Sequence, residues 1–269
     1  MQYDPIKRSL GKVFNTTPFL RVLFYRLLDI LLLRTWHIKK AVRQWTGEHQ
    51  GKRNILDAGA GFGQYTYFLS GLQKDWFVKA VDVKEEQVAD CNRFFSQAGR
   101  TNVIFEKADL TTFVQPDTFD LILSVDVMEH ILEDEKVFSN FYDSITNNGM
   151  LLISTPSDQG GSDVHEHGEE ESFIDEHVRD GYNILEIQEK LKKAGFSRTE
   201  AHYSYGTPGQ IGWKLSMKYP IQMLNSSKLF FVLLPFYYIL AFPVALICNS
   251  LDISKVHETG TGLVVKAWK

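Results

Sequence analysis

Cysteine is scarce in this chain, and the few cysteines follow no recognisable pattern. Cys91 and Cys248 lie far apart in the sequence, so they form neither a zinc-ligand spacing nor a disulfide framework. The N-terminal stretch also does not resemble a secretory signal, because Arg21, Arg26 and Asp29 interrupt its apolar run and no small-residue cleavage site follows. These absences favour a reducing compartment, and we expect the protein on the cytoplasmic side of the membrane.

The chain also lacks the surplus of positive charge that is typical of nucleic-acid binding. Its 29 Lys and Arg are outnumbered by 33 Asp and Glu, for a net charge of −4, so no nucleic acid partner is expected. The cations gather at one end: eleven of them, against three acids, precede residue 54, which gives +8 there and −12 in the remainder. This asymmetry favours either an anionic surface or ligand, or a basic helix packed on the chain's own acidic body.

Internal repeats and low-complexity runs are absent, and 269 residues with 44% hydrophobic content suffice for one sizeable core. From Asn54 onward, short apolar runs alternate with longer amphipathic stretches, which is typical of βα units on a parallel sheet. The predicted strands are 54–58, 77–81, 103–106, 119–124, 150–154, 198–203 and 262–268. The predicted helices are 64–72, 85–98, 134–146 and 184–194.

Two segments fall outside this alternation. The region 18–46 is predicted to be helical, and residues 207–250 are inserted between the sixth and seventh strands. The chain is therefore divided into an N-terminal helical cap (1–50), a core (51–206), an apolar helical insertion (207–250) and the last strand of the core (251–269). Both extra segments are expected to cover the carboxyl ends of the strands, where open α/β sheets bind ligands.

The sharpest motif is a glycine-rich turn between the first strand and a helix, Asp57-Ala58-Gly59-Ala60-Gly61-Phe62-Gly63. Glycine lets the backbone turn tightly and approach a ligand, and the helix N-terminus offers unpaired N–H groups. Asp57 would repel a nucleotide pyrophosphate but suits the ammonium group of a methionine moiety. The dinucleotide fingerprint requires glycine where Gln64 stands. Asp82 ends the second strand, where it is placed to accept hydrogen bonds from ribose hydroxyls.

Together with Asp109 after the third strand and the strand 119–124, these residues resemble the successive motifs of class I S-adenosylmethionine-dependent methyltransferases. The resemblance implies an α/β fold, a Rossmann-like seven-stranded sheet with an antiparallel last strand, and S-adenosylmethionine as the cofactor. The alternative is a sheet of this kind that does not bind S-adenosylmethionine. The cofactor-binding residues implied are Asp57, Gly59, Ala60 and Gly61 at the methionine end, Asp82 and Val83 at the ribose, Asp109 and Leu110 at the adenine, and Ser124 and Val125 on the fourth strand.

The segment after the fourth strand, Asp126-Val127-Met128-Glu129-His130, lies where this family holds the reacting methyl group. It resembles the acid-x-x-Glu-His stretch of ubiquinone-biosynthesis O-methyltransferases. A hydroxyl acceptor must lose a proton, and a neutral His is suited to accept it. His130 is therefore the first candidate for a general base, with Glu129 as a further catalytic candidate. Alternatively, Glu129 and His130 orient the next helix, or they share a divalent cation with Asp126, although we assign no metal ligand.

A second polar cluster follows the fifth strand, at the edge where the acceptor should enter. It spans 163–177 and places His165, His167 and His177 among many acidic residues. His165 is a candidate catalytic residue there. The alternative is a solvated loop without a catalytic role.

Residues 229–248 contain no charged side chain and are long enough to cross a bilayer. A single crossing would leave the seventh strand on the wrong side of the membrane, and Pro235 and Pro243 are expected to break a straight helix. We therefore predict a bent element at a membrane interface, a hydrophobic lid over a lipophilic acceptor, or a buried dimer contact.

The N-terminal helix favours the first two interpretations, because cations flank its apolar residues, and such a combination suits the surface of an anionic membrane. These cations are Arg21, Arg26, Arg34, Lys39, Lys40 and Arg43. Otherwise, this helix and 229–248 pack together as an ordinary core. We predict methyl transfer to a small lipophilic acceptor, at an oxygen of a prenylated phenol or quinol, by a cytoplasmic enzyme that is peripheral to the inner face of the membrane. The alternatives are a sugar or natural-product methyltransferase and a non-catalytic, membrane-associated scaffold that binds the cofactor.

Overall fold

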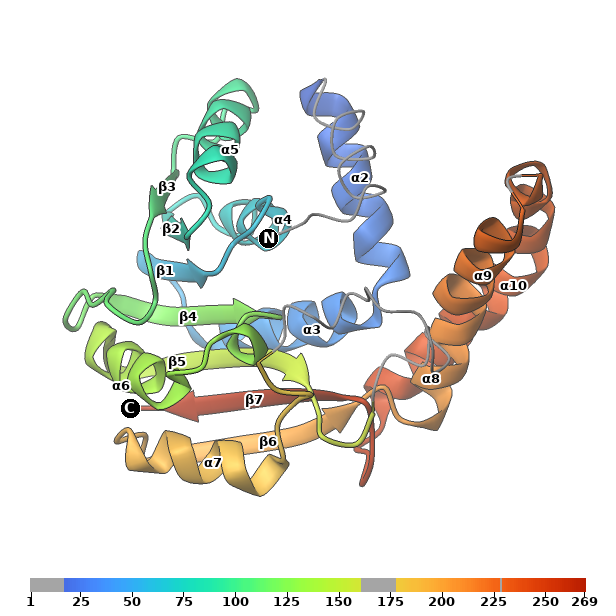
Figure 1. Cartoon of the computed structure of the whole chain (residues 1–269). Coiled ribbons are helices and arrows are strands. Elements are labelled where there is room, and N and C mark those ends of the chain that lie inside the picture. Colours follow the sequence, from blue (N-terminus) through green and yellow to red (C-terminus); the bar gives the residue numbers. More distant parts are fainter. Residues whose placement is uncertain (1–16, 161–177, 228) are drawn as a thin grey trace.

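The computed structural model describes residues 17–160, 178–227 and 229–269, and its centre is a seven-stranded sheet (Figure 1). The strands lie in the order β3-β2-β1-β4-β5-β7-β6. Neighbouring strands from β3 to β5 are parallel, whereas β7 is antiparallel to both β5 and β6. This arrangement confirms the predicted α/β fold class. The strands are β1 (Arg53–Ala58), β2 (Trp76–Asp82), β3 (Val103–Lys107), β4 (Phe119–Val125), β5 (Ile145–Pro156), β6 (Arg198–Ser204) and β7 (Gly262–Trp268).

Helices cover both faces of this sheet. On one face, residues of α6 (Asp134–Ser144) and α7 (Ile184–Lys193) form a core with alternate residues of the strands. On the other face, α3 (Leu33–Glu48), α4 (Gln64–Ser70) and α5 (Glu85–Gln97) pack on the remaining strand residues. The alternation of side chains along each strand explains both cores, because a central strand buries both of its faces.

The N-terminal region consists of two helices instead of one. Helix α2 (Pro18–Leu31) begins at Thr17, whose hydroxyl accepts a hydrogen bond from the Leu20 N–H, and it ends where Leu32 adopts an extended conformation. Helix α2 reaches the glycine-rich turn, since the Tyr25 hydroxyl donates a hydrogen bond to the Phe62 carbonyl. The predicted helical cap is therefore present, and α2 is the part of it that contacts the turn.

The insertion forms an arm that extends away from the sheet instead of folding over the strand ends (Figure 1). It consists of α8 (Thr207–Trp213), the π-helix η2 (Lys214–Lys218), α9 (Tyr219–Ser226) and α10 (Phe230–Ser254). The first three run alongside α10, and the hydroxyls of Tyr237 and Tyr238 donate 2.8 Å hydrogen bonds to the carbonyls of Leu215 and Ser216. The arm follows β6 in the chain and precedes β7, so both of its ends adjoin the sheet.

Helix α10 corrects two expectations. Pro235 and Pro243 do not break it, since both lie inside one continuous helix of 25 residues. Each proline removes one N–H donor, and the remaining backbone hydrogen bonds keep the helix continuous. Within the described part of the chain, α10 is the one helix long and apolar enough to cross a bilayer, judged by length and composition, yet only 11% of that apolar window is buried. An ordinary buried core is therefore the wrong interpretation of this segment in the single chain.

Candidate active site

The glycine-rich turn lies at the carboxyl end of β1, and its conformation requires glycine. Gly59 and Gly61 have φ values of 80° and 52°, in the left-handed region. A Cβ atom on Gly59 would lie 2.4 Å from a methyl carbon of Val127, whereas one on Gly61 would meet nothing within 4 Å. The turn therefore packs tightly against the β4 side and leaves open space at Gly61, which fits a ligand held close to the backbone.

Asp57 is buried at the end of β1, directly before this turn. Its carboxylate accepts a 2.5 Å hydrogen bond from the Thr66 hydroxyl of α4. Burial raises the pKa of Asp57 to about 7. Gln64, which replaces the third glycine of a dinucleotide site, donates a 2.9 Å hydrogen bond to Asp29 at the end of α2. The residue that distinguishes this turn from a dinucleotide turn therefore ties it to the N-terminal cap.

Asp82 stands at the end of β2, on the other side of the turn. Its two carboxylate oxygens accept 2.9 Å hydrogen bonds from the backbone N–H groups of Gly61 and Lys84. Val83 next to it is exposed. Asp82 is therefore held in place beside the turn by two backbone N–H groups.

The predicted adenine end follows β3. Asp109 is exposed, and one of its carboxylate oxygens accepts hydrogen bonds from the backbone and hydroxyl of Thr111. Leu110 is buried, and its carbonyl accepts a 2.8 Å hydrogen bond from Asn140. The structure thus places Asp109 and Leu110 after β3, the strand that pairs with β2 and its terminal Asp82.

The fourth strand supplies the remaining predicted residues. Ser124 is fully buried, and its hydroxyl has no hydrogen-bond partner among the described residues. Val125 is half-buried, and Asp126 follows it with a φ of 52°. A buried hydroxyl without a partner and a strained backbone next to it are features that favour a ligand site.

Glu129 and His130 lie together on the short 3₁₀-helix η1 (Met128–His130), but they face different surroundings. Glu129 is 1% exposed and accepts a 3.0 Å hydrogen bond from the Thr155 hydroxyl at the end of β5. Burial, with a further contribution from the charge of Asp126, raises the pKa of Glu129 to about 8. His130 is exposed. The third catalytic candidate, His165, lies outside the described residues.

The alternative in which Asp126, Glu129 and His130 share a divalent cation finds no support. Across residues 17–160, 178–227 and 229–269, no group of three or more His, Cys, Asp or Glu side chains is arranged to hold a metal ion. Asp126 instead pairs with Arg34 of α3. An ion pair to a guanidinium occupies the carboxylate that the cation would need.

Two arginines of the N-terminal cap belong to the site, although their sequence positions predict the polar edge of a membrane-facing helix. The side chain of Arg21 is 3% exposed, pairs with Asp90 of α5 and donates a 2.8 Å hydrogen bond to the Phe62 carbonyl. Arg34 pairs with Asp126. This prediction was wrong because a cation that interrupts an apolar helix can also face an acidic partner on its own domain. That interruption is the signal that could have identified both residues.

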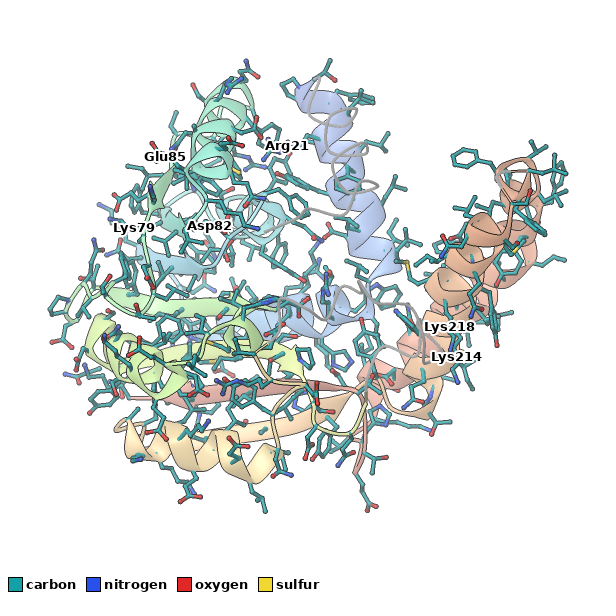
Figure 2. All side chains as sticks on the ribbon, viewed as in Figure 1. Arg21, Lys79, Asp82, Glu85, Lys214 and Lys218 are labelled. Carbon is teal, nitrogen blue, oxygen red and sulfur yellow. The ribbon has the colours of Figure 1, made fainter. Side chains whose placement is uncertain are left out.

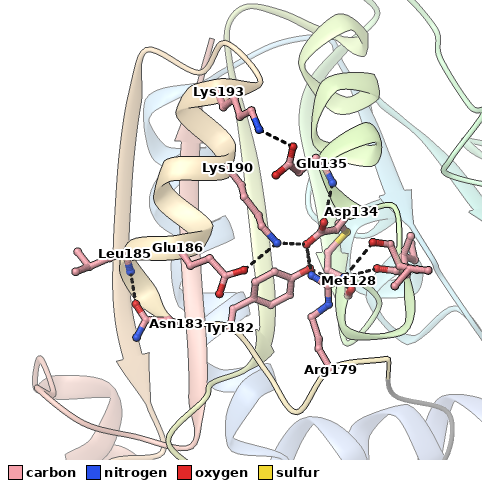
Figure 3. A network of polar contacts seen from close by, with 12 residues as sticks. Met128, Asp134, Glu135, Arg179, Tyr182, Asn183, Leu185, Glu186, Lys190 and Lys193 are labelled. Carbon is pink, nitrogen blue, oxygen red and sulfur yellow. Dashed lines mark hydrogen bonds and ion pairs between the residues drawn. The ribbon is translucent and has the colours of Figure 1, made fainter.

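A polar network holds the segment that carries Glu129 and His130 (Figure 3). Asp134, at the start of α6, accepts hydrogen bonds from Arg179, the Lys190 ammonium group (2.9 Å) and the Tyr182 hydroxyl (2.7 Å). Arg179 also donates a 2.7 Å hydrogen bond to the Ile131 carbonyl. Burial opposes ionisation of Asp134, but these donors hold its pKa below the usual value. The network connects α7 to η1, and no local sequence pattern indicated it.

The strand order, the glycine-rich turn and Asp82 define a Rossmann-like methyltransferase fold. Residues 55–149 match the family model of a methyltransferase domain. This match and the fold agree with the predicted resemblance to class I S-adenosylmethionine-dependent methyltransferases. The open space at Gly61 and the placement of Asp82 fit this cofactor.

Similar proteins act on different acceptors. Phosphoethanolamine N-methyltransferase from Triticum aestivum is 28% identical over 145 residues, which is 54% of this chain and 28% of that protein. Ubiquinone biosynthesis O-methyltransferase from Rickettsia akari is 21% identical over 123 residues, 46% of this chain and 48% of that protein. The chain thus spans less than half of the length of either relative.

The solved structures show a similar fold. Haemonchus contortus phosphoethanolamine N-methyltransferase 2 in complex with S-adenosyl-L-methionine superposes with a TM-score of 0.61 and 19% sequence identity. The match covers 87% of this chain and 52% of that chain. This likeness shows the fold, and it leaves the acceptor of the present chain to be argued from its own residues.

Proposed function

We propose that this protein transfers a methyl group from S-adenosylmethionine to a small lipophilic acceptor, at an oxygen of a prenylated phenol or quinol. The observation that carries the proposal is the path from Asp126 to the arm. Arg34 pairs with Asp126, and its backbone N–H donates a 3.1 Å hydrogen bond to the Tyr205 hydroxyl. Tyr205 lies two residues before the first helix of the arm. An exposed apolar arm therefore begins beside the strand end that bears the candidate catalytic residues.

The chain's own residues have three tasks in such a reaction. When bound, S-adenosylmethionine supplies a methyl group that is already activated for displacement. The protein has to position the acceptor, exclude water and take up the hydroxyl proton. We assign the proton to His130, because an imidazole can accept a proton near neutral pH. Glu129 is given a positioning role, because a carboxyl group with a pKa of about 8 is mostly neutral at pH 7.

We place the reaction at the inner, cytoplasmic face of a membrane, with the protein bound peripherally. The support is the outer face of α10, where Phe231, Phe236 and Leu240 are 66–77% exposed. Contiguous apolar surface of this kind is costly in water and marks interaction sites. A water-soluble sugar acceptor would not require it, so this surface favours the lipophilic acceptor over the sugar or natural-product alternative.

An amine acceptor is a second candidate. The relatives include N-methyltransferases as well as O-methyltransferases. In this chain, Glu129 lies in η1 with a pKa of about 8, and its ionised form would accept the proton that an amine must lose before it is methylated. Mass spectrometry of the product distinguishes the two candidates, because an O-methyl ether and an N-methyl amine fragment differently.

The test is transfer of an isotope-labelled methyl group to lipid extracts that contain prenylated quinols. We expect label in the organic phase with the wild type and at least a tenfold lower rate with Asp82→Asn, which removes a hydrogen-bonding charge at the ribose end. Asp117→Asn is the matched control, because its exposed carboxylate pairs with Lys269 far from the turn. Label confined to water-soluble products would overturn the lipophilic acceptor. Cofactor binding without transfer to any extract would instead support the non-catalytic scaffold.

A further inference from the structure

The outer side of α3 borders a cavity of about 590 Å³ that the proposed reaction does not use. The opposite side of α3, with Ile38, Val42 and Trp45, packs on the sheet. The cavity therefore opens on the surface of the molecule, between the end of α2 and the end of α10. We call it the α3 groove; its lining residues are Asp29, Trp36, Lys39, Lys40, Arg43, Gln44 and Ile253.

The charge of the α3 groove is predominantly positive. Three of the lining residues are cations and one is an acid, which leaves two positive charges in excess. Lys39 pairs with Asp29, and Lys40 donates a hydrogen bond to the Ile253 carbonyl at the end of α10. Arg43 is exposed, and its guanidinium lies 5.8 Å from the centre of the Phe68 ring. Clustered Lys and Arg donors of this kind suit a phosphate group.

An aromatic side chain completes the groove. The Trp36 indole N–H donates a 3.1 Å hydrogen bond to the Ile30 carbonyl, which fixes the ring at the end of α2. Trp is enriched at membrane interfaces, because its ring is largely apolar and its N–H is polar. The groove thus combines the two kinds of side chain that meet lipid headgroups.

Exposed apolar surfaces adjoin the groove on both sides. On α2, the exposed side chains follow a helical stripe and end at Ile30, the residue bonded to Trp36; they are Phe19, Leu23, Leu27 and Ile30. On α10, exposed apolar residues continue to Ile247 and Leu251, close to Ile253. Figure 1 shows α2 and the arm leaving the body on the same side, with the N-terminal end of α3 between their bases.

The exposed surface of the arm also carries no acidic residue. Residues 201–251 contain no Asp or Glu, and Asp252 near the end of α10 is fully buried beside His37 and His257. Lys214 and Lys218 supply positive charge on the arm (Figure 2). This distribution matches a surface of anionic lipid, which attracts nearby cations and repels carboxylates.

We propose that the α3 groove binds the phosphate of an anionic phospholipid headgroup while the apolar faces of α2 and α10 lie in the membrane interface. This inference deepens the proposed function and rests on its membrane contact. An interfacial orientation keeps the sheet on one side of the bilayer, as the return of both ends of the arm to the sheet requires.

The test is co-sedimentation of the full chain with vesicles of phosphatidylcholine alone and with about one third phosphatidylglycerol. We expect stronger binding to the anionic vesicles. Arg43→Gln should weaken it about fivefold and the double variant Lys40→Gln/Arg43→Gln about 30-fold, because each cation near such a surface contributes a similar free energy. Arg43→Gln alone keeps the test valid if loss of the Lys40 bond to Ile253 impairs folding.

The matched control is Lys192→Gln/Lys193→Gln, which makes the same charge change on α7, on the opposite face of the sheet. Equal weakening of vesicle binding by both double variants would refute the α3 groove as the headgroup site, because net charge alone would then explain binding. Displacement of the wild type from vesicles by millimolar glycerol phosphate would also refute a phospholipid as the ligand, since a soluble phosphate compound would then bind the groove better. Binding that is selectively lost in the groove variants supports the proposal.

Failure of this inference and failure of the proposed function are distinguishable. If the wild type methylates a detergent-dispersed acceptor but binds no vesicle, the groove proposal fails and the methyl transfer stands. If it binds anionic vesicles through the groove but methylates no lipophilic acceptor, the groove stands and the acceptor assignment fails.

Discussion

Binding of the cofactor should weaken as the pH falls below 7, because Asp57 must ionise before it can face the ammonium group of S-adenosylmethionine. Asp57 is 2% exposed, and burial raises its pKa to about 7. At pH 7 about half of the molecules carry the carboxylate, and at pH 5.5 only about one in thirty do. Between pH 7 and about pH 5.5 the affinity should therefore fall about 15-fold, or ~1.6 kcal/mol.

The stability of the ligand-free protein should change in the opposite direction. A carboxyl group whose pKa is higher in the folded than in the unfolded chain contributes stability below the unfolded value, and this contribution is lost as the pH rises through the folded value. For Asp57, that interval runs from about pH 4 to about pH 7. Weaker binding at low pH therefore cannot be caused by unfolding through this group.

Titration calorimetry with S-adenosylhomocysteine measures the effect, in buffers with different ionisation heats, for the wild type and Asp57→Asn. The wild type should release close to one proton on binding near pH 6, and the variant none. Asn keeps an oxygen that can accept the hydrogen bond from Thr66, so the local packing is conserved. An affinity that is constant from pH 5.5 to 7 would refute the reasoning. An equal pH dependence of the affinity in the wild type and Asp57→Asn would refute it as well.

Three further predictions concern the turn and the η1 segment. Gly59→Ala should lower cofactor affinity more than tenfold, because its Cβ would lie 2.4 Å from Val127, whereas Gly51→Ala, also at positive φ but with nothing within 4 Å, should bind normally in the same calorimetric assay. Glu129→Gln should keep methyl-transfer activity within about threefold at pH 7, since Gln resembles the neutral carboxyl, and a hundredfold loss would make ionised Glu129 the base. Asp134→Asn should cost about 2 kcal/mol in urea unfolding at pH 7 and less below pH 4, because the stability from a lowered pKa disappears as the pH falls; an equal cost at both pH values would contradict this.

Much of the fold was predictable because its signals are local. The alternation of apolar strands with amphipathic stretches predicted six of the seven strands to within one residue of their observed bounds. Strand β5 begins at Ile145, five residues before its predicted start and inside the predicted helix 134–146. The glycine-rich turn was predictable for the same reason, since Gly59 and Gly61 adopt a left-handed conformation that glycine, with no Cβ atom, tolerates best. Asp57 and Asp82 follow from their positions at the ends of strands that are neighbours in a parallel sheet.

The sequence by itself thus determined the sheet, the turn and the cofactor, because the spacing of hydrophobic residues and the residue types of a turn are properties of short segments. Only the tertiary structure decided which cations are buried: Arg21 and Arg34 pair with Asp90 and Asp126, while the exposed Arg43 lines the α3 groove. It also decided that α10 lies in an exposed arm, since the same apolar run is compatible with a core, a lid or an interface. Which partner a side chain meets depends on the packing of segments far apart in the chain, and no local pattern encodes that choice.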